Sequence, residues 1–318
     1  MIENNQKIFD LCVIGCGPAG ITAAIFALRA ELKVVVIEKD VPGGKIVKTG
    51  IIENYPGFKS IDGPTLALDF YNHLMNLQPL YLYGEVLKLK NISNYYKEIT
   101  YFSNNQEKIV IAKSVIIAVG MTEKKIGVDK EEEFFGKGIS YCAVCDGALY
   151  KGGTIAVIGG GNSALEESIY LTKFVKTLYL IHRRYEFRAD KILQKKIREL
   201  PQIKLLLNYI LLKINGTDRL SSIEIIENNT KKILKLDIDC LFTFIGLSPN
   251  INFLSDLNLK TDNNFIAVNE SFETSVKGIY AIGDVINKKL RQITTAVSEG
   301  SIAAQEIISY LEEENANK

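Results

Sequence analysis

The sequence is poor in histidine and cysteine and has no long hydrophobic run. Five cysteines in 318 residues are too few for a disulfide scaffold, and a reducing compartment would keep them as thiols unless function requires a bond. Only two histidines are present, His73 and His182. No apolar run reaches the roughly 18 residues of a membrane span, and residues 1–10 have no apolar segment of signal-peptide length. We therefore expect a cytoplasmic protein with no membrane partner.

The charges nearly cancel, with 38 Lys plus Arg against 37 Asp plus Glu and a formal net charge of +1. This balance gives no reason to expect a nucleic-acid partner or an anionic membrane surface. A hydrophobic content of 47% and a charged content of 24% are typical of a soluble globular protein. The length is sufficient for two domains, each with its own core.

Cys142 and Cys145 form a Cys-x-x-Cys pair that is followed at once by Asp146 and a glycine. Thiols at this spacing can close on each other within one turn, so the pair can carry two electrons as dithiol and disulfide. The pair lies between two glycine-rich segments, 15–20 and 159–164, each of the kind found in dinucleotide-binding loops. This position predicts an electron relay.

The first glycine-rich segment stands between a predicted strand at 9–14 and a predicted helix at 21–30, and a second predicted strand at 33–37 ends at Glu38. Glycines permit a tight turn and let a pyrophosphate approach the helix N-terminus, while an acid at the end of the second strand suits a ribose 2′-hydroxyl. The residues predicted to bind this dinucleotide are Gly15, Gly17, Pro18, Ala19, Gly20 and Glu38, with further loop amides at Gly43, Gly44 and Asn54.

The second glycine-rich segment repeats the pattern with the charge reversed. At the position equivalent to Glu38 stands His182, followed by Arg183 and Arg184, with Arg188 one turn further on if that stretch is helical. Arginines here form charge-assisted bonds to a 2′-phosphate, whereas an acid would repel it. The sequence therefore predicts NADPH at the second loop. The residues predicted to bind it are Gly159, Gly161, Asn162, Ser163, His182, Arg183, Arg184 and Arg188.

Two dinucleotides of different type and a dithiol fit one scheme, in which hydride passes from NADPH to a flavin and two electrons pass from the flavin to the disulfide. Departing thiolates need a proton donor, and neither histidine is well placed along the chain. Asp146, next to Cys145, is the nearest acid, and partial burial could raise its pKa enough to serve. The alternative role for Asp146 is a helix cap.

The other three cysteines are expected to be structural. Cys12 falls on the first predicted strand and Cys240 in a later apolar run, where small buried thiols are common, and Cys16 occupies a variable position of the glycine loop. A zinc site made from Cys12, Cys16 and the redox pair would require a thiol in a sheet core to turn outward, so we disfavour it.

The ordered set of motifs resembles the bacterial low-molecular-weight thioredoxin reductases along essentially the whole chain. The matching segments are GxGPAG at 15–20, ENYPGF at 53–58, CAVCDG at 142–147, GGGNSALE at 159–166, HRRYEFRA at 182–189, FIGLSPN at 244–250, TSVKGIYAIGDV at 274–285 and LRQITTA at 290–296. The resemblance implies an α/β fold of two Rossmann-like dinucleotide-binding domains, each with a central parallel sheet and a small antiparallel meander. The NADPH-binding domain, 121–247, would be inserted into an FAD-binding domain made of 1–120 and 248–318.

By the same resemblance, Cys145 would face the flavin, Cys142 would attack the disulfide of a thioredoxin, and Asp146 would donate the proton. It also implies a homodimer and domains that rotate relative to each other. Further residues implied at the cofactors are Lys39, Lys45, Ala118, Gly120, Asp284, Val285, Arg291, Gln292 and Ile293 for FAD, and Glu166 for NADPH. Lys45, Val119 and Cys16 depart from the family pattern, and Lys45 would favour a reduced, anionic flavin.

Two other functions remain open at this stage. One is an NADPH-dependent ferredoxin or flavodoxin reductase on the same scaffold, which the Cys142 and Cys145 pair argues against because such relatives lack it. The other is a non-enzymatic nucleotide-binding protein in which the cysteine pair is a structural zinc clip.

Overall fold

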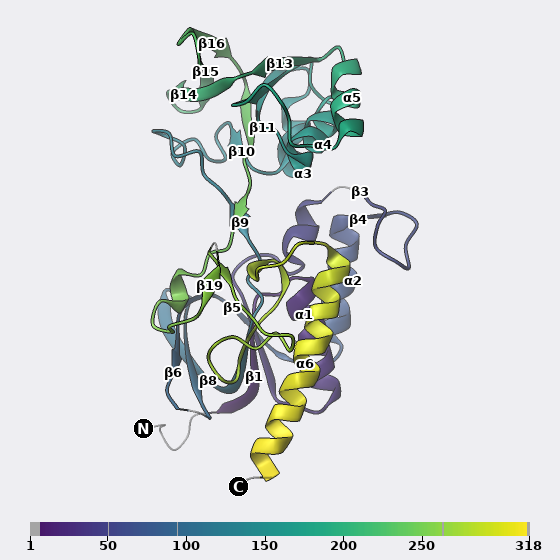
Figure 1. The fold of residues 1–318 in the computed structure, drawn as a ribbon, viewed down its shortest axis with the longest axis vertical. Coiled ribbons are helices and arrows are strands. Elements are labelled where there is room, and N and C mark those ends of the chain that lie inside the picture. Colours follow the sequence, from purple (N-terminus) through teal and green to yellow (C-terminus); the bar gives the residue numbers. More distant parts are fainter. Residues whose placement is uncertain (1–6, 50, 94, 263, 317–318) are drawn as a thin grey trace. The chain divides into compact units, whose positions relative to one another are not determined.

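The computed structural model describes residues 7–49, 51–93, 95–262 and 264–316 (Figure 1). The chain divides into two compact units, which we call unit 1 (Met1–Thr122 with Ser248–Lys318) and unit 2 (Glu123–Leu247). Each unit contains a central parallel sheet with helices and a smaller antiparallel part. The predicted fold class, an α/β protein with one Rossmann-like unit inserted into another, is confirmed.

Unit 1 is built on a seven-stranded sheet in the order β5-β2-β1-β8-β7-β6, with β21 also paired to β8. Its parallel members are β1 (Ile8–Ile14), β2 (Val34–Glu38), β5 (Leu80–Tyr83), β8 (Gln106–Ile117) and β21 (Ile279–Ala281). Its antiparallel members are β6 (Glu85–Asn91) and β7 (Lys97–Ser103). The strand β8 serves both parts, because residues 111–117 pair with β1 and residues 106–112 pair with β7.

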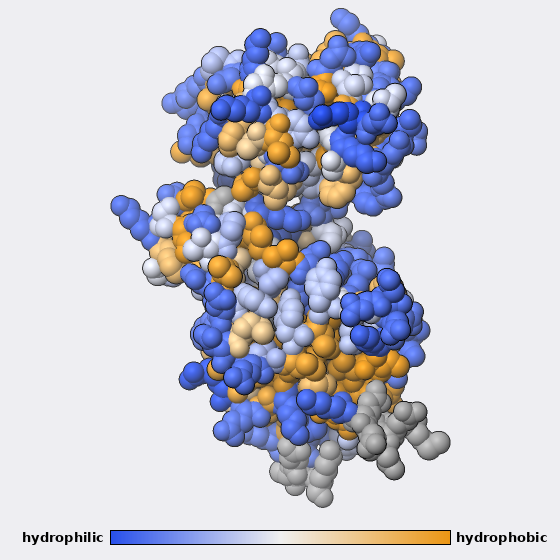
Figure 2. Space-filling model, turned by 180° about the vertical axis from the view of Figure 1, so that it is seen from behind, coloured by the Kyte–Doolittle hydropathy of each residue, from blue (hydrophilic) through white to orange (hydrophobic). Residues whose placement is uncertain are grey.

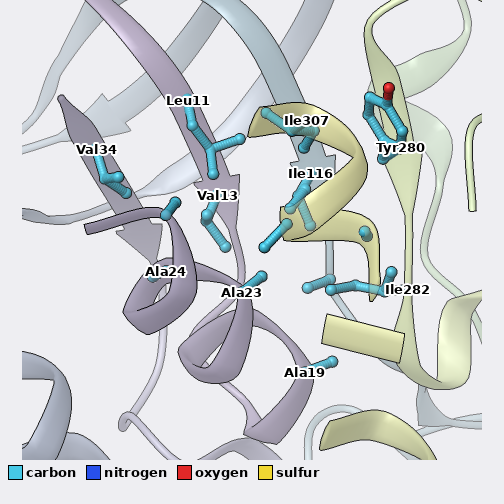
Figure 3. Close-up of a cluster of buried hydrophobic side chains, with 14 of the residues drawn as sticks. Leu11, Val13, Ala19, Ala23, Ala24, Val34, Ile116, Tyr280, Ile282 and Ile307 are labelled. Atoms are coloured by element: carbon cyan, nitrogen blue, oxygen red, sulfur yellow. The ribbon is translucent and has the colours of Figure 1, made fainter. Parts of the chain in front are cut away.

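The two faces of this sheet carry separate hydrophobic cores because successive side chains of a strand point to opposite faces. Leu11 and Val13 of β1 pack against the helices α1 (Pro18–Arg29) and α6 (Ile293–Ala316), as Figure 3 shows. Small residues of α1 make the approach close, and a Cβ on Gly300 of α6 would collide with the carbonyl oxygen of Ala19. Cys12 and Ile14 point to the other core, under the antiparallel part.

Unit 2 has a five-stranded parallel sheet in the order β10-β17-β11-β12-β13 and a three-stranded antiparallel meander β14-β15-β16. The parallel strands are β10 (Ile139–Ser140), β11 (Thr154–Gly159), β12 (Thr177–His182), β13 (Ile203–Leu207) and β17 (Cys240–Phe244). The meander consists of β14 (Tyr209–Gly216), β15 (Leu220–Glu227) and β16 (Ile233–Asp237). The helices are α3 (Ala143–Asp146), α4 (Asn162–Leu171) and α5 (Lys191–Glu199).

The remaining elements are one helix, several 3-10 turns and a set of two-residue strands. In unit 1 they are α2 (Gly63–Met75), the 3-10 turns η1 (Gly44–Lys48), η3 (Asn252–Leu254) and η4 (Gly283–Val285), and the strands β3 (Ile51–Ile52), β4 (Ile61–Asp62), β19 (Thr261–Asp262) and β20 (Phe265–Ile266). Unit 2 adds the 3-10 turn η2 (Gly147–Tyr150). The strands β9 (Thr122–Glu123) and β18 (Leu247–Ser248) pair with each other where the chain passes between the units.

Three stretches differ from what their local pattern suggests. From residue 81 the sequence alternates in short strands, a pattern typical of an antiparallel meander, but β5 joins the parallel sheet beside β2, a pairing that a four-residue strand does not reveal. Apolar helical spacing is clear only over 302–311, whereas α6 begins at Ile293, because its first turns carry small residues that fit against α1 rather than an apolar stripe. The stretch 183–188, on whose helicity the placement of Arg188 one turn from the other arginines depended, is not helical, and α5 begins only at Lys191.

Candidate active site

Cys142 and Cys145 form a disulfide at the start of α3, with their Cα atoms 5.3 Å apart. Cys142 is the N-cap residue, and the backbone N–H of Cys145 donates to its Sγ at 3.1 Å. In the reduced pair the same N–H would stabilise a thiolate on Cys142, because donors at a helix N-terminus favour negative charge. Cys145 is an exposed residue and Cys142 is half-buried.

Asp146 lies half-buried at the end of α3. The alternative prediction that it caps the helix is wrong, since Cys142 occupies the N-cap position and the Asp146 side chain caps neither α3 nor η2. Ala143 of α3, Tyr150 and Cys240 share a hydrophobic core of unit 2. Burial is the main cause that raises the pKa of Cys240 to about 12, and the nearby charge of Asp146 contributes. Cys240 is therefore a buried thiol in the core that Ala143 of α3 also enters.

The segment that leads into the redox helix is anchored by residues that sequence reasoning missed. The buried carboxylate of Glu131 accepts hydrogen bonds from the Tyr141 hydroxyl at 2.9 Å and from the backbone N–H groups of Ile126 and Gly127. The Ser140 hydroxyl accepts from the backbone N–H of Cys142 at 3.0 Å. No motif marks Glu131, because the contact depends on how the loop 124–138 folds back.

The first glycine loop has no room for side chains at two positions and open space at another. A Cβ on Gly15, whose φ is +104°, would lie 2.5 Å from the carbonyl oxygen of Ala118, and one on Gly20 would collide with the oxygen of Gly15. At Gly17, the N-cap of α1, the nearest atom would be 4.0 Å away, and no side chain caps the helix. This is a cradle with uncapped N–H groups, as a pyrophosphate requires.

Glu38 is held at this loop by backbone donors. Its carboxylate accepts from the N–H of Cys16 at 2.6 Å and from those of Lys39 and Asp40 at 2.8 Å. Burial raises the pKa of Glu38, and these three bonds oppose the rise. Cys16 fits the variable loop position because its side chain is buried in the core beside α1, where burial raises its pKa to about 12. The carboxylate is thus fixed at the end of β2, where a ribose hydroxyl was predicted to bind.

Other predicted cofactor residues of unit 1 gather around the same end of the sheet. The turn η4 carries Asp284 beside α1, and a Cβ on Gly283 would lie 3.2 Å from that of Ala19. A largely buried ion pair of Lys288 and Glu299 fixes this turn, since Glu299 also accepts from the N–H of Gly283 at 2.7 Å. Sequence reasoning missed this pair as well.

The remaining residues of that group are placed less uniformly. Asn54 donates to the Gln292 side chain at 3.2 Å, so two motifs far apart in the sequence meet. Arg291 folds back over the Phe265 ring at 4.4 Å and donates to backbone carbonyls, and its buried Nε has no partner among the described residues. Val285 is fully buried in the core, and its role at the cofactor stays a prediction.

The second glycine loop leads from β11 into α4. A Cβ on Gly161, the N-cap, would meet nothing within 4 Å, and no side chain caps the helix. Asn162 exchanges hydrogen bonds with Asp190, donating to its carboxylate and accepting from its N–H, both at 2.8 Å. Ser163 and Glu166 are exposed beside it. The loop offers the same uncapped donors for a phosphate as the loop of unit 1.

The cationic stretch 182–188 is divided by burial. Arg183, Arg184 and Arg188 are exposed, and the backbone N–H of Arg188 donates to the carbonyl of Gly160 at 2.8 Å, which closes this stretch onto the glycine loop. His182 is buried; its ring packs on Phe187 and covers Gly160, and burial lowers its pKa. The arginines are therefore the cations available to a ligand, and a ligand role for His182 stays a prediction.

The chain is similar to known proteins along most of its length. The family described as pyridine nucleotide-disulphide oxidoreductase matches residues 9–300. A protein named thioredoxin reductase from Mycoplasma pneumoniae is 46% identical over 314 residues, covering 98% of both chains, and the one from Bacillus subtilis is 39% identical, covering 98% of this chain and 97% of its own. A crystal structure of Lactococcus lactis thioredoxin reductase aligns with a TM-score of 0.87 at 38% identity, covering 96% of this chain and 99% of that one.

Proposed function

This chain belongs to the pyridine nucleotide-disulphide oxidoreductase family, and on that basis we propose how its two units carry out the reduction of thioredoxin. It is an NADPH-dependent thioredoxin-disulfide reductase and a flavoprotein that uses FAD. The observation that carries this function is the Cys142–Cys145 disulfide at the start of α3, in the unit whose glycine loop is followed by exposed arginines.

We assign FAD to unit 1 and NADPH to unit 2 from the chemistry of the two loops. In unit 1 the cradle at Gly15, Gly17 and Gly20 fits a pyrophosphate. The carboxylate of Glu38 fits a free ribose hydroxyl, which would donate a hydrogen bond to it. In unit 2 the exposed Arg183 and Arg184 fit the 2′-phosphate. Both loops have space where phosphates would lie and no side chain that blocks it.

The cysteines and one acid carry out the exchange with thioredoxin. When bound, FAD and NADPH supply the two electrons that open the Cys142–Cys145 bond. The Cys142 thiolate then attacks one sulfur of the thioredoxin disulfide, forming a mixed disulfide while the other thioredoxin sulfur leaves as a thiolate. Cys145 attacks Sγ of Cys142, which restores the internal disulfide and releases the second sulfur. Asp146 supplies a proton to a departing thiolate.

A turnover assay tests this function. We expect NADPH consumption to depend on added thioredoxin from the same organism, with NADH a much poorer donor. Ferredoxin, flavodoxin and a glutaredoxin-like protein serve as alternative acceptors in parallel reactions. Turnover with ferredoxin or flavodoxin but not with thioredoxin would contradict the assignment and favour the other flavoprotein function.

We also propose that the protein is a cytoplasmic homodimer formed through unit 1. The edge strand β5 exposes Leu80 and Tyr83 to 39% and 65%, and Figure 2 shows hydrophobic areas on unit 1 in the view from behind. An exposed, partly apolar sheet edge is a surface that proteins usually cover. The buried free thiols Cys12, Cys16 and Cys240 fit a reducing compartment. No helix among the described residues is long and apolar enough to cross a membrane.

Sedimentation equilibrium tests the dimer. The wild-type protein should have about twice the 35.5 kDa chain mass, and Leu80→Arg should shift it toward monomer. Leu87→Arg, on β6 and similarly exposed at 41%, is the matched control and should stay dimeric. A dimer that tolerates Leu80→Arg would place the interface elsewhere.

A further inference from the structure

The stretch that carries Arg183 and Arg184 is held from behind by a polar cluster that no motif marks. The cluster consists of Tyr185, Asn208, Glu227, Asn228 and Asn229, which come from the arginine stretch itself and from both ends of the β14–β15 hairpin. Asn208 and Glu227 are buried at 6% and 9% exposure.

The cluster holds the main chain of both arginines. The side-chain amide of Asn228 donates to the carbonyl oxygen of Arg183 at 2.9 Å. The backbone N–H of Asn208 donates to the carbonyl oxygen of Arg184 at 3.3 Å. These contacts follow from the sheet, because β12 and β13 are neighbours and His182 pairs with Leu207, so the residues after each strand lie side by side.

Asn208 is the centre of the cluster. Its side-chain amide donates one hydrogen to the Tyr185 hydroxyl at 3.0 Å and the other to the Glu227 carboxylate, and its oxygen accepts from Asn228 at 3.2 Å. Its φ of +65° lies in the left-handed region, which asparagine tolerates better than most residues. The side chain uses both donors and its acceptor, a set that only the amides of asparagine and glutamine offer, and the glutamine amide would lie one methylene further from the backbone.

Glu227 completes the cluster as an acceptor. One oxygen accepts from Asn208 and, at 3.4 Å, from the Tyr185 hydroxyl; the other accepts from the backbone N–H groups of Asn229 and Thr230. The N–H of Thr230 is the main cause that lowers the pKa of Glu227 to about 2, so the group is a carboxylate at neutral pH. The Tyr185 hydroxyl in turn accepts from Asn208 and from Asn229 at 3.1 Å.

The opposite side of the arginine stretch is held by different contacts. The ring Nε2 of His182 lies 3.1 Å from the carbonyl oxygen of Glu186, and the N–H of Arg188 is bonded to Gly160. The backbone is thus fixed on both sides while the side chains of Arg183 and Arg184 remain exposed. A fixed backbone reduces the conformational freedom that two long side chains lose when they bind a phosphate.

We propose that Asn208, with Tyr185 and Glu227, positions Arg183 and Arg184 for the 2′-phosphate of NADPH and thereby contributes to selectivity over NADH. The inference rests on the proposed NADPH site. These three are positioning residues, since they act through the arginine backbone and the described contacts give them none with the phosphate loop.

The test is equilibrium binding of two cofactor fragments to the FAD-loaded protein by calorimetry. Asn208→Gly removes the side chain and keeps the left-handed backbone available. We expect the Kd of 2′,5′-ADP to rise about tenfold, as for the loss of one well-placed hydrogen-bond set, while that of 5′-AMP changes less than about twofold. The KM for NADPH should rise by a similar factor with kcat nearly unchanged. Tyr185→Phe, at an exposed position, should raise the Kd of 2′,5′-ADP about threefold and leave that of 5′-AMP nearly unchanged.

Asn105→Gly is the matched control, because Asn105 has a φ of +60° in the β7–β8 hairpin of unit 1. It should alter neither Kd, and a shift equal to that of Asn208→Gly would overturn the inference. Equal weakening of 2′,5′-ADP and 5′-AMP by Asn208→Gly would also overturn it. If Asn208→Gly unfolds, Tyr185→Phe decides in its place.

An arginine variant separates this inference from the proposed function. Replacing Arg183 and Arg184 by alanine should weaken 2′,5′-ADP selectively. If it does and the Asn208→Gly and Tyr185→Phe variants do not, only the positioning role is wrong. If the arginine variant shows no selectivity, the proposed NADPH site is wrong and the positioning role with it.

Discussion

Cys142→Ser and Cys145→Ser should each reduce thioredoxin turnover by at least about 10³-fold, because a hydroxyl can neither form nor exchange a disulfide. Reduction of the bound flavin by NADPH should persist in both variants, since the cysteines take no part in that step. Anaerobic stopped-flow absorbance of the flavin measures the first half-reaction, and steady-state thioredoxin reduction measures the whole. Loss of flavin reduction in either variant would contradict the proposed order of electron transfer.

Cys240→Ser is the matched control for these variants. Cys240 belongs to the same unit and is a fully buried free thiol, so its replacement tests whether a further thiol of unit 2 is required. We expect a small loss of stability and turnover within about twofold of wild type. A loss as large as that of Cys145→Ser would show that the disulfide pair is not the sole thiol route.

The two cysteine variants also decide which sulfur attacks thioredoxin. Exposure alone favours Cys145, whereas the N–H of Cys145 beside Cys142 Sγ favours a thiolate on Cys142. Because the thiolate is the nucleophile, we expect Cys145→Ser to accumulate a mixed disulfide with thioredoxin and Cys142→Ser to accumulate none. Non-reducing electrophoresis of the mixture distinguishes the two outcomes, and the reverse pattern would assign the attack to Cys145.

The sequence predicted the features that depend on local pattern. Each of these features depends on a few adjacent residues. They are the two glycine loops, the strands around them and the Cys-x-x-Cys pair, and a tight turn, a buried strand and a disulfide within one turn all have local sequence requirements. The thioredoxin reductase function followed from their order. The roles of individual FAD-site residues, such as Asp284 and Arg291, remain predictions.

The contacts that hold the site together could not be predicted in the same way. Glu131 with Tyr141, Lys288 with Glu299, and Asn208 with Glu227 join residues 10 to 19 positions apart through folded loops. Nothing in their spacing distinguishes them from ordinary surface polar residues, because their partners are chosen by the fold. His182 illustrates the converse, since its place beside two arginines indicated a cation and the structure buries it against Phe187.

Replacing Arg183 and Arg184 together by alanine should raise the KM for NADPH about 100-fold while the KM for NADH changes less than about threefold, since two charge-assisted bonds to a phosphate are lost. The structure makes this selective, because both side chains are exposed while the backbone is held separately by Asn208 and Asn228. Steady-state kinetics with each nucleotide and saturating thioredoxin measures the effect.

Removing two positive charges also changes the long-range field, and this must be separated from the local bonds. Lys195→Ala with Arg198→Ala removes the same charge from the exposed face of α5, in the same unit. That control should leave both KM values within about twofold of wild type at physiological salt, where charges beyond about 8 Å are screened. If the arginine variant raises the KM for NADH as much as that for NADPH, the two arginines do not bind the 2′-phosphate. The difference in charge between Glu38 and the arginine stretch would then not distinguish an FAD site from an NADPH site.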